Sequence, residues 1–481
     1  MNNKNRNRNP AHGWRLAPGL LAAAVLAACA PIPKLPDAAK PLQAEALGLR
    51  ESQAQTAQQL AGDWWTAYRD PQLDTLMERA LAQHPSLAQA QARLARAAAA
   101  IENAQAAELP TASLSADATR QRYTEHGLVP PPVAGHIYTN ANLQAGLSYD
   151  VDFFGRHAAA LRSALGTQKA AAAEAAAARL NLSAAIARGY LGLARVLEQR
   201  RLLDEQLRRS EQSLVLVRQR VEAGLDNAPS LRSAETPLPE LRRQGLALDA
   251  QAELLRHQLA ALSAQPQEAL AGLSPRLPAA LALRSDAQLG VDLLGRRPEL
   301  VAARWRVEAA SQDVAVARTQ FYPNVSLTAF AGFSSLGLDN LLNAGSRQFG
   351  LGPSLRLPIF DSGRLGAQLK GAAADRDAAV AAYNGALLEA LRDAADQLSG
   401  LQSLQRQQRE QGQALAHVQA SRDLAQQRYD AGLSNYLAVL NAEQALLSQR
   451  RALLDLQGQD LEAQVGLIRA LGGGWSETAQ P

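Results

Sequence analysis

Two hydrophobic periodicities alternate along the chain and predict two kinds of element. Residues 85–109 and 298–322 are helical sequence that starts at a proline, which the first turn of a helix tolerates, and stops before Pro110 or Pro323. Beyond each stop, apolar residues recur at every second position, which is the period of a strand with two different faces. The expected strands form one hairpin in each half of the chain, over residues 111–122, 140–150, 323–334 and 347–358.

Long helical sequence follows each hairpin. Residues 364–429 contain no proline, and at about 1.5 Å per residue a helix of this length reaches on the order of 100 Å. Each long helix is expected to turn at a glycine and return through residues 230–262 or 436–470, with a kink at Pro237 and Pro239. Apolar spacings of four and three predict coiled-coil packing, at Leu203, Leu207, Leu214, Val217 and Val221.

The second half of the chain repeats the first. A Gly-Arg pair at residue 155 recurs 208 residues later at 363, and an Arg-x-x-Ala-Gly-Leu segment at residue 220 recurs at the same offset at 428. We expect a first repeat over residues 61–270, a second over 271–472 and a tail over 473–481. Strand-to-helix turns are predicted at Gly155 and Gly363, and helix-tip turns at Gly224, Leu225, Gly432 and Leu433.

The predicted strands imply an oligomer. A tilted strand of about ten residues crosses a bilayer, but four strands cannot close a barrel, because the smallest barrels have about eight and an open edge in lipid leaves backbone groups unsatisfied. Two copies would give an eight-stranded barrel filled with side chains, and three copies a twelve-stranded barrel with a pore. The alternative is a soluble sheet with its polar face on solvent.

Composition agrees with a mainly helical fold. Of the 481 residues, 47% are hydrophobic and 20% charged, which excludes disordered and collagen-like chains. Only 4% are aromatic, and long stretches of Ala, Leu, Gln, Arg and Glu are typical of extended helices. The expected fold class is therefore mainly α with a transmembrane β part.

Residues 1–28 have the pattern of a secretory signal. A segment with four basic residues and no acid precedes an apolar run, residues 16–28, that is too short to span a bilayer. Leu26-Ala-Ala-Cys29 is similar to a bacterial lipobox, so Cys29 is predicted to carry a covalent lipid at the start of a linker over residues 29–60. Ala30, and not Asp, follows the cysteine, and by resemblance to bacterial lipoprotein sorting this favours the outer membrane. The alternative is an ordinary signal whose cleavage site contains the chain's single cysteine.

Charge and sequence motifs reduce the number of function classes that fit this chain. Beyond the leader, 45 basic side chains balance 45 acidic ones, which removes the usual argument for nucleic-acid binding. The seven histidines form no His-Glu-x-x-His, and no nucleotide-binding glycine pattern occurs, so we expect no enzyme, no metal and no cofactor besides the lipid. His126 and His136 flank three prolines, where a weak metal role competes with a plain exposed loop. Gly472-Gly-Gly474 is interpreted as a helix stop followed by a flexible tail.

Several motifs occur in the order found in one known family. They are the lipobox, Arg297-Pro-Glu-Leu300, Phe321-Tyr-Pro-Asn324, Ile359-Phe-Asp-Ser-Gly-Arg364 and the turn ending at Leu433. Together with the duplication, they resemble the outer-membrane efflux protein family, and most closely the lipoprotein factors of multidrug efflux systems of the resistance-nodulation-division type.

This resemblance implies a homotrimer whose strands form one twelve-stranded barrel in the outer membrane and whose helices form a tunnel through the periplasm. The tunnel would dock on a periplasmic adaptor and an inner-membrane resistance-nodulation-division pump, and would conduct drugs or other small toxic compounds passively. Two alternatives stay open: a conduit for type I protein secretion, and a structural coiled-coil lipoprotein without a pore.

The resemblance also implies a gate at the periplasmic helix tips. By the match at the Gly-Leu turn, the constricting positions are Tyr429, Leu437 and Asn441, and the turn itself is completed by Asn435 and Tyr436. Relatives commonly have an aspartate at the position of Asn441, so a ring of acids is not implied here. Nearby acids are candidates to replace it, or are solvated surface charges, at Asp226, Glu222 and Asp430. The two tyrosines have the alternative role of packing between helices.

Overall fold

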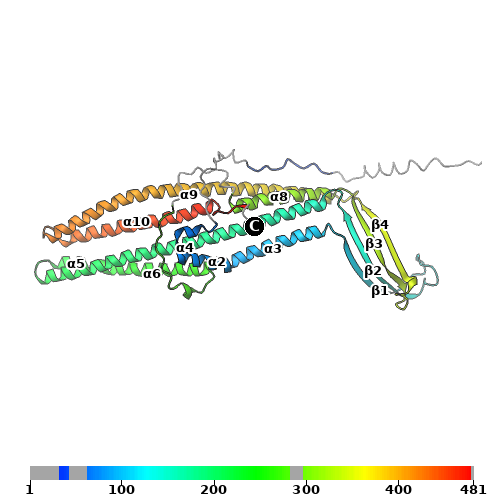
Figure 1. Cartoon of the computed structure of the whole chain (residues 1–481), viewed down its shortest axis with the longest axis horizontal. Coiled ribbons are helices and arrows are strands. Elements are labelled where there is room, and N and C mark those ends of the chain that lie inside the picture. The colour runs from blue at the N-terminus through cyan, green and yellow to red at the C-terminus, as the bar shows by residue number, and fades with distance from the viewer. Residues whose placement is uncertain (1–31, 43–61, 282–295, 478–481) are drawn as a thin grey trace, which may run out of the picture. The chain divides into compact units, whose positions relative to one another are not determined.

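Helices dominate the computed structural model, which describes residues 32–42, 62–281 and 296–477 (Figure 1). The first part contains η2 (Trp64–Tyr68), α2 (Pro71–Gln83), α3 (Pro85–Ala106), β1 (Thr111–Arg122), β2 (Ile137–Val151), α4 (Arg156–Glu222), α5 (Ala228–Glu235), α6 (Pro237–Leu262) and η3 (Gln267–Leu270). The second contains α8 (Pro298–Thr319), β3 (Asn324–Leu336), η4 (Ala344–Ser346), β4 (Arg347–Arg356), α9 (Arg364–Asp430) and α10 (Tyr436–Ala470). This order confirms the predicted fold class. The predicted Cys29 site lies outside the described residues.

Prolines set several helix boundaries. Pro85 and Pro298 are the first residues of α3 and α8, where the missing N–H would in any case lack an intrahelical partner. The first return helix is interrupted as predicted, because α5 ends at Glu235 and α6 begins at Pro237. The corresponding helix of the second repeat, α10, contains no proline and continues for 35 residues.

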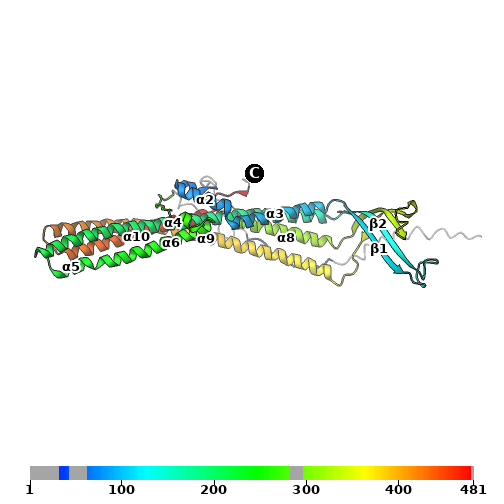
Figure 2. The same ribbon diagram turned by 90° about the horizontal axis from the view of Figure 1, so that it is seen from below.

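The chain divides into two units. The strand unit consists of residues 1–40, 95–169 and 305–381, and the helical unit of residues 41–94, 170–304 and 382–481. In the helical unit, α5 and α6 lie beside α4, while α10 lies beside α9 (Figures 1 and 2). Each pair is a helical hairpin closed by one glycine turn.

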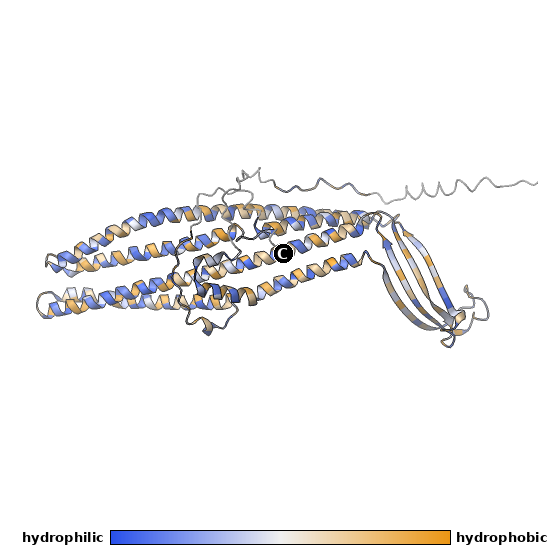
Figure 3. Cartoon of the chain, viewed as in Figure 1, coloured by the Kyte–Doolittle hydropathy of each residue, from blue (hydrophilic) through white to orange (hydrophobic). Residues whose placement is uncertain are grey.

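The strand unit contains one antiparallel sheet in the order β1-β2-β3-β4. β2 and β3 join the hairpins of the two repeats, with Asn140 opposite Leu336 at one end of the ladder and Val151 opposite Val325 at the other. Hydrophobic and hydrophilic residues alternate along the strands (Figure 3). Among the described residues, β1 and β4 each pair on one side only, and every residue of β1 is exposed. The single chain therefore presents two free sheet edges.

In the strand unit, a small hydrophobic core joins the end of α8, the start of α9 and the N-terminal segment. Phe321 packs with Val314 of α8 and with Leu365 and Leu369 of α9, and Leu35 packs against this cluster. The backbone N–H of Ala39 donates to Asp377 Oδ1 of α9 over 3.2 Å. Residues 33–40 are therefore held along the start of α9.

The largest hydrophobic core belongs to the helical unit. It contains Trp64, Trp65 and Met77 from the N-terminal helices, and Tyr190 and Ile186 from α4, all nearly inaccessible to solvent. The Tyr190 hydroxyl donates to Asp70 Oδ2 over 2.6 Å, while Asp70 Oδ1 accepts from the Gln72 N–H at the start of α2. One carboxylate thus caps α2 and attaches it to α4.

The glycines after α10 form a packed turn. Gly472, Gly473 and Gly474 all have positive φ, and a Cβ at Gly473 would overlap Leu180 of α4. Beyond them, Glu477 pairs with Arg304 over 2.7 Å. The helix stop is where it was predicted, but the interpretation of a flexible tail is wrong as far as residue 477, because contacts distant in sequence hold it. Among the described helices, none is both long and apolar enough to cross a bilayer.

Candidate functional site: the two helix turns

The two helix-tip turns have the same backbone geometry. Gly224 and Gly432 both have φ of +71°, a conformation that glycine adopts without strain. The following leucine closes each turn, with Leu225 N–H donating to Arg220 O and Leu433 N–H to Arg428 O, both over 2.8 Å. The duplicated sequence therefore produces a duplicated turn.

Both turns expose a leucine. Leu225 is 68% exposed and Leu433 72% exposed, because each follows a glycine that directs the chain away from the helix it ends. The turns differ in the residue that follows. Asn227 caps α5 by accepting from the Ser230 N–H over 3.0 Å, whereas Asn435 makes no side-chain cap at α10. The pair of turns thus offers two similar but distinguishable apolar surfaces.

Two predicted site residues, Tyr429 and Tyr436, point into the protein. They are 8% and 3% exposed and pack with Val217 of α4 and Val439 of α10. Their ring centroids lie 5.4 Å apart, with the ring planes tilted by 59°. Burial raises the pKa of Tyr429, and raises that of Tyr436 to about 12. The structure therefore gives both rings a packing role between the two helical hairpins; we call this the tyrosine cluster.

Charged residues border the tyrosine cluster. The Arg220 guanidinium carbon lies 5.0 Å from the centre of the Tyr429 ring, within range of a cation–π contact. Asp226 is half-buried, and its Oδ1 accepts from the Asn227 N–H over 2.8 Å. Glu222 and Asp430 are exposed. Asp430 Oδ1 accepts from Gln426 Nε2 over 2.8 Å, so Asp226 and Asp430 both have local partners.

The remaining gate candidates lie on another side of α10. Leu437 is 48% exposed, and Asn441, one turn later, is exposed as well. Residues four apart lie on the same face of a helix. The structure therefore places Leu437 and Asn441 together on an accessible face and separates them from Tyr429.

The strand-to-helix turns present aromatic residues, of which the motif analysis included Phe360 and Tyr322 but not Phe153 or Phe154. Gly155 and Gly363 have φ of +74° and +86°. Next to them, Phe153 is 66% exposed and Phe360 is 86% exposed. Phe154 stacks on Tyr322 with ring centroids 4.8 Å apart. The sequence signal for these exposed aromatics is a phenylalanine within three residues before the turn glycine, and it occurs in both repeats.

The Arg297 motif has a structural role. Arg297 is 8% exposed and donates to Ala390 O and to Asp393 Oδ2, both over 3.2 Å. Arg469 donates to the same Asp393 Oδ2 over 2.8 Å. The start of α8 is thus tied to α9 and α10 by one carboxylate shared between two guanidinium groups.

The loop between β1 and β2, which contains His126 and His136, does not arrange these two side chains as metal ligands. His126 and His136 are both exposed, and His136 Nδ1 lies 3.0 Å from Ala134 O. Within the part of the chain that the structure describes, no three His, Cys, Asp or Glu side chains come together in a group that could hold a metal.

Comparison with known proteins identifies the architecture. The sequence model described as "Outer membrane efflux protein" matches residues 76–286 and 289–473. The multidrug resistance outer membrane protein MdtP of Escherichia coli O6:H1 is 30% identical over 421 residues, 86% of each chain. The pyoverdine export outer membrane protein OpmQ of Pseudomonas aeruginosa is 32% identical over 469 residues, 95% of this chain and 96% of OpmQ. The crystal structure of the outer membrane protein VceC of Vibrio cholerae superposes with a TM-score of 0.80 at 35% identity, covering 87% of this chain and all of VceC.

Proposed function

The chain belongs to the outer membrane efflux protein family, and from this membership we propose that three copies form the outer-membrane conduit of a tripartite efflux system. The conduit exports drugs or other small toxic compounds and is driven by its partners. The free edges of the sheet carry this proposal. β1 of one copy and β4 of the next can pair, and three copies then close a twelve-stranded barrel without an open edge.

We propose that Cys29 carries the lipid at the boundary between the barrel and the helices. The N-terminal segment supports this placement, because Pro33 Cγ lies 3.7 Å from the Cβ position of Gly366, just after the turn that exposes Phe360. Pro33 is the fourth residue after Cys29, and four Cα-to-Cα steps reach at most about 14 Å. An acyl chain on Cys29 would therefore lie near the exposed aromatic residues, which favour a membrane interface.

The lipid can be tested by metabolic labelling. Cys29→Ser should abolish incorporation of radiolabelled fatty acid while leaving the amount of protein unchanged, since Cys29 is the chain's single cysteine. Labelling that persists in the variant would contradict the lipid proposal and leave the conduit proposal untouched.

The exposed leucines of the two turns are the proposed docking points for a periplasmic adaptor. Leu225 and Leu433 supply apolar surface at the end of each hairpin, where a partner helix can bury it. On α10, Leu437 and Asn441 are the proposed constricting residues of the tunnel, because they are accessible and share one face. Tyr429 is left out of the constriction, because its ring is used within the chain.

A photocrosslinking amino acid at Leu433 tests the partners in living cells. Capture of an adaptor together with a proton-driven pump, identified by mass spectrometry, is the expected result. The same amino acid at Tyr436, which is 3% exposed, is the matched control and should capture much less. Capture of an ATP-driven exporter would move the assignment to protein secretion, and capture of no partner at Leu433 would contradict the tripartite proposal.

A further inference from the structure

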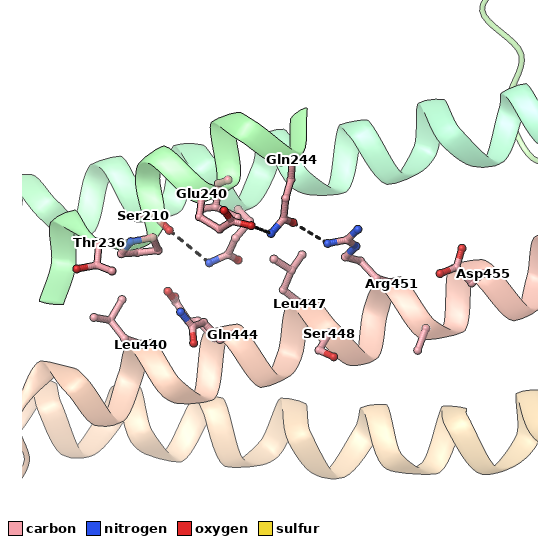
Figure 4. A pocket seen from close by; sticks show the side chains of 15 residues that line it. Ser210, Thr236, Glu240, Gln244, Leu440, Gln444, Leu447, Ser448, Arg451 and Asp455 are labelled. Carbon is pink, nitrogen blue, oxygen red and sulfur yellow. Dashed lines mark hydrogen bonds between the residues drawn. The ribbon is translucent and has the colours of Figure 1, made fainter. Parts of the chain in front are cut away.

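A pocket of about 530 Å³ lies between the two helical hairpins of the helical unit. Residues from α4 and α6 form one wall and residues from α10 the other (Figure 4). Because both walls come from one chain, the pocket does not depend on the proposed trimer. Its volume lies within the range of about 300–1,000 Å³ that small-molecule sites commonly have.

The pocket combines apolar walls with an ordered polar chain. Leu241, Leu440 and Leu447 supply apolar surface. Across the pocket, Arg451 Nη1 donates to Gln244 Oε1 over 2.7 Å, and Gln244 Nε2 donates to Glu240 Oε1 over 2.8 Å (Figure 4). This chain of hydrogen bonds connects α10 to α6 and fixes the position of the polar groups at one side of the pocket.

The lining carries more negative than positive charge. Three carboxylates, Glu240, Glu443 and Asp455, face one guanidinium, that of Arg451. Two of the three acids have partners, because Glu240 accepts from Arg243 and Gln244, and Asp455 accepts from Gln199. Glu443 differs from both of them in that one of its two oxygens has no hydrogen-bond partner among the described residues.

Glu443 is a buried carboxylate whose charge is incompletely compensated. It is only 6% exposed, and its Oε2 has no hydrogen-bond partner among the described residues. The nearest cation is Arg422, whose Nη2 lies 3.8 Å from Oε1, beyond hydrogen-bond distance. Burial raises the pKa of Glu443, while the charges of Arg422 and Arg209 and a hydrogen bond from Gln206 act in the opposite direction. An unpaired carboxylate in such a place is unfavourable unless a further cation or donor reaches it.

We propose that this pocket binds a small organic cation, an ammonium or guanidinium group on an apolar body, with Glu443 as its counter-ion. The apolar body packs against Leu241, Leu440 and Leu447, and the charged group lies beside the Glu443 carboxylate, whose buried Oε2 reaches it by a rotation of the side chain toward the pocket. Such a ligand contacts α6 and α10 at once, so its binding favours the arrangement of the two hairpins seen here. The lining does not include the tip leucines assigned above, Leu225 and Leu433.

Internal duplication supplies a matched control residue. Glu235 is the repeat equivalent of Glu443, 208 residues earlier and likewise preceded by alanine. It does not line the pocket, and its Oε2 is paired with Arg232 over 2.9 Å. Neutralising either glutamate removes the same charge from the chain, but only Glu443 faces the pocket.

The test uses the purified full chain in nonionic detergent and measures fluorescence anisotropy with ethidium, a rigid monovalent cation. Fluorescein is the anionic comparison of similar size. We expect saturable ethidium binding with one site per chain and no saturable fluorescein binding. Glu443→Gln should weaken ethidium binding by about tenfold or more, as expected for the loss of a charge-assisted contact. Glu235→Gln should bind ethidium as the unmodified chain does.

A second variant fills the space without altering the buried charge. Ser448 lines the pocket and is exposed, so Ser448→Trp can occupy the pocket while leaving the cores intact, and should also weaken ethidium binding. Circular dichroism melting identifies any variant that fails to fold, in which case the other variant decides. Equal binding by the unmodified chain, Glu443→Gln and Ser448→Trp would overturn the proposal. Equal weakening in Glu235→Gln, or saturable fluorescein binding, would overturn it as well.

Discussion

Tyr429→Phe and Tyr429→Ala separate a packing role from a hydroxyl-dependent gate role. The Tyr429 ring is buried against Tyr436 and Val217, and its hydroxyl has no hydrogen-bond partner among the described residues. Removing that hydroxyl alone should leave stability unchanged or raise it by up to about 1 kcal/mol, because an unsatisfied buried polar group is removed. Removing the ring leaves a cavity between the hairpins.

The size of the alanine effect follows from the contacts. A buried aromatic residue replaced by alanine costs about 3–5 kcal/mol. Within that sum, the ring pair with Tyr436 contributes about 0.5–1.5 kcal/mol and the Arg220 contact about 0.5–1 kcal/mol. We therefore expect Tyr429→Ala to lower the free energy of unfolding by about 3–5 kcal/mol, with no comparable loss in Tyr429→Phe.

Denaturant unfolding of the purified protein in detergent, followed by circular dichroism, measures these differences, and conductance in planar bilayers measures leakage. Leu433→Ala is the control, because Leu433 is 72% exposed and its truncation should change stability by less than about 0.5 kcal/mol. A Phe variant that loses as much stability as the Ala variant, or that leaks like it, would refute the packing role and restore a role for the hydroxyl.

Two further changes test buried features of the helical unit. Burial raises the pKa of Asp460 above its ordinary 3.8, so the native state holds its proton more tightly than the unfolded state and stability falls as pH rises through the raised pKa. Asp460→Asn should therefore unfold at higher denaturant concentration than the unmodified chain at neutral pH, with the gain vanishing below about pH 4; a gain independent of pH would contradict this cause. Gly473→Ala should destabilise by about 1–3 kcal/mol in the same assay, since its Cβ would overlap Leu180, whereas Gly385→Ala, with open space around it, should be neutral or stabilising by up to about 1 kcal/mol.

Short sequence patterns predicted the helices, strands and turns well, because neighbouring residues alone determine where these elements begin and end. Alternation identified the four strands, and β1 spans Thr111–Arg122, the bounds expected from the pattern. The Gly-Leu motif predicted both helix turns, since only the backbone of a few neighbouring residues decides them. The break at Pro237 followed from the chemistry of proline itself.

What escaped prediction depends on contacts between distant segments. Tyr429 and Tyr436 lie near a turn, and their sequence position does not say whether they face a partner helix or an open tunnel. The apolar pattern of one helix does not show where the other hairpin packs, and it is the other hairpin that buries both rings. Gly473 likewise packs against Leu180, almost 300 residues away in sequence, so a run of three glycines gave only the helix stop.

The pairing of β2 with β3 has a consequence for assembly. This ladder joins the hairpin of the first repeat to that of the second over Asn140 to Val151, inside one polypeptide. A single-repeat chain would have to make the same join between separate molecules, with a loss of translational and rotational freedom of about 4–15 kcal/mol each time. Covalent linkage replaces that loss by a high effective concentration of one hairpin for the other. Half of the seams between hairpins in the proposed ring, those of β2 with β3, thus form at a rate independent of protein concentration in the membrane.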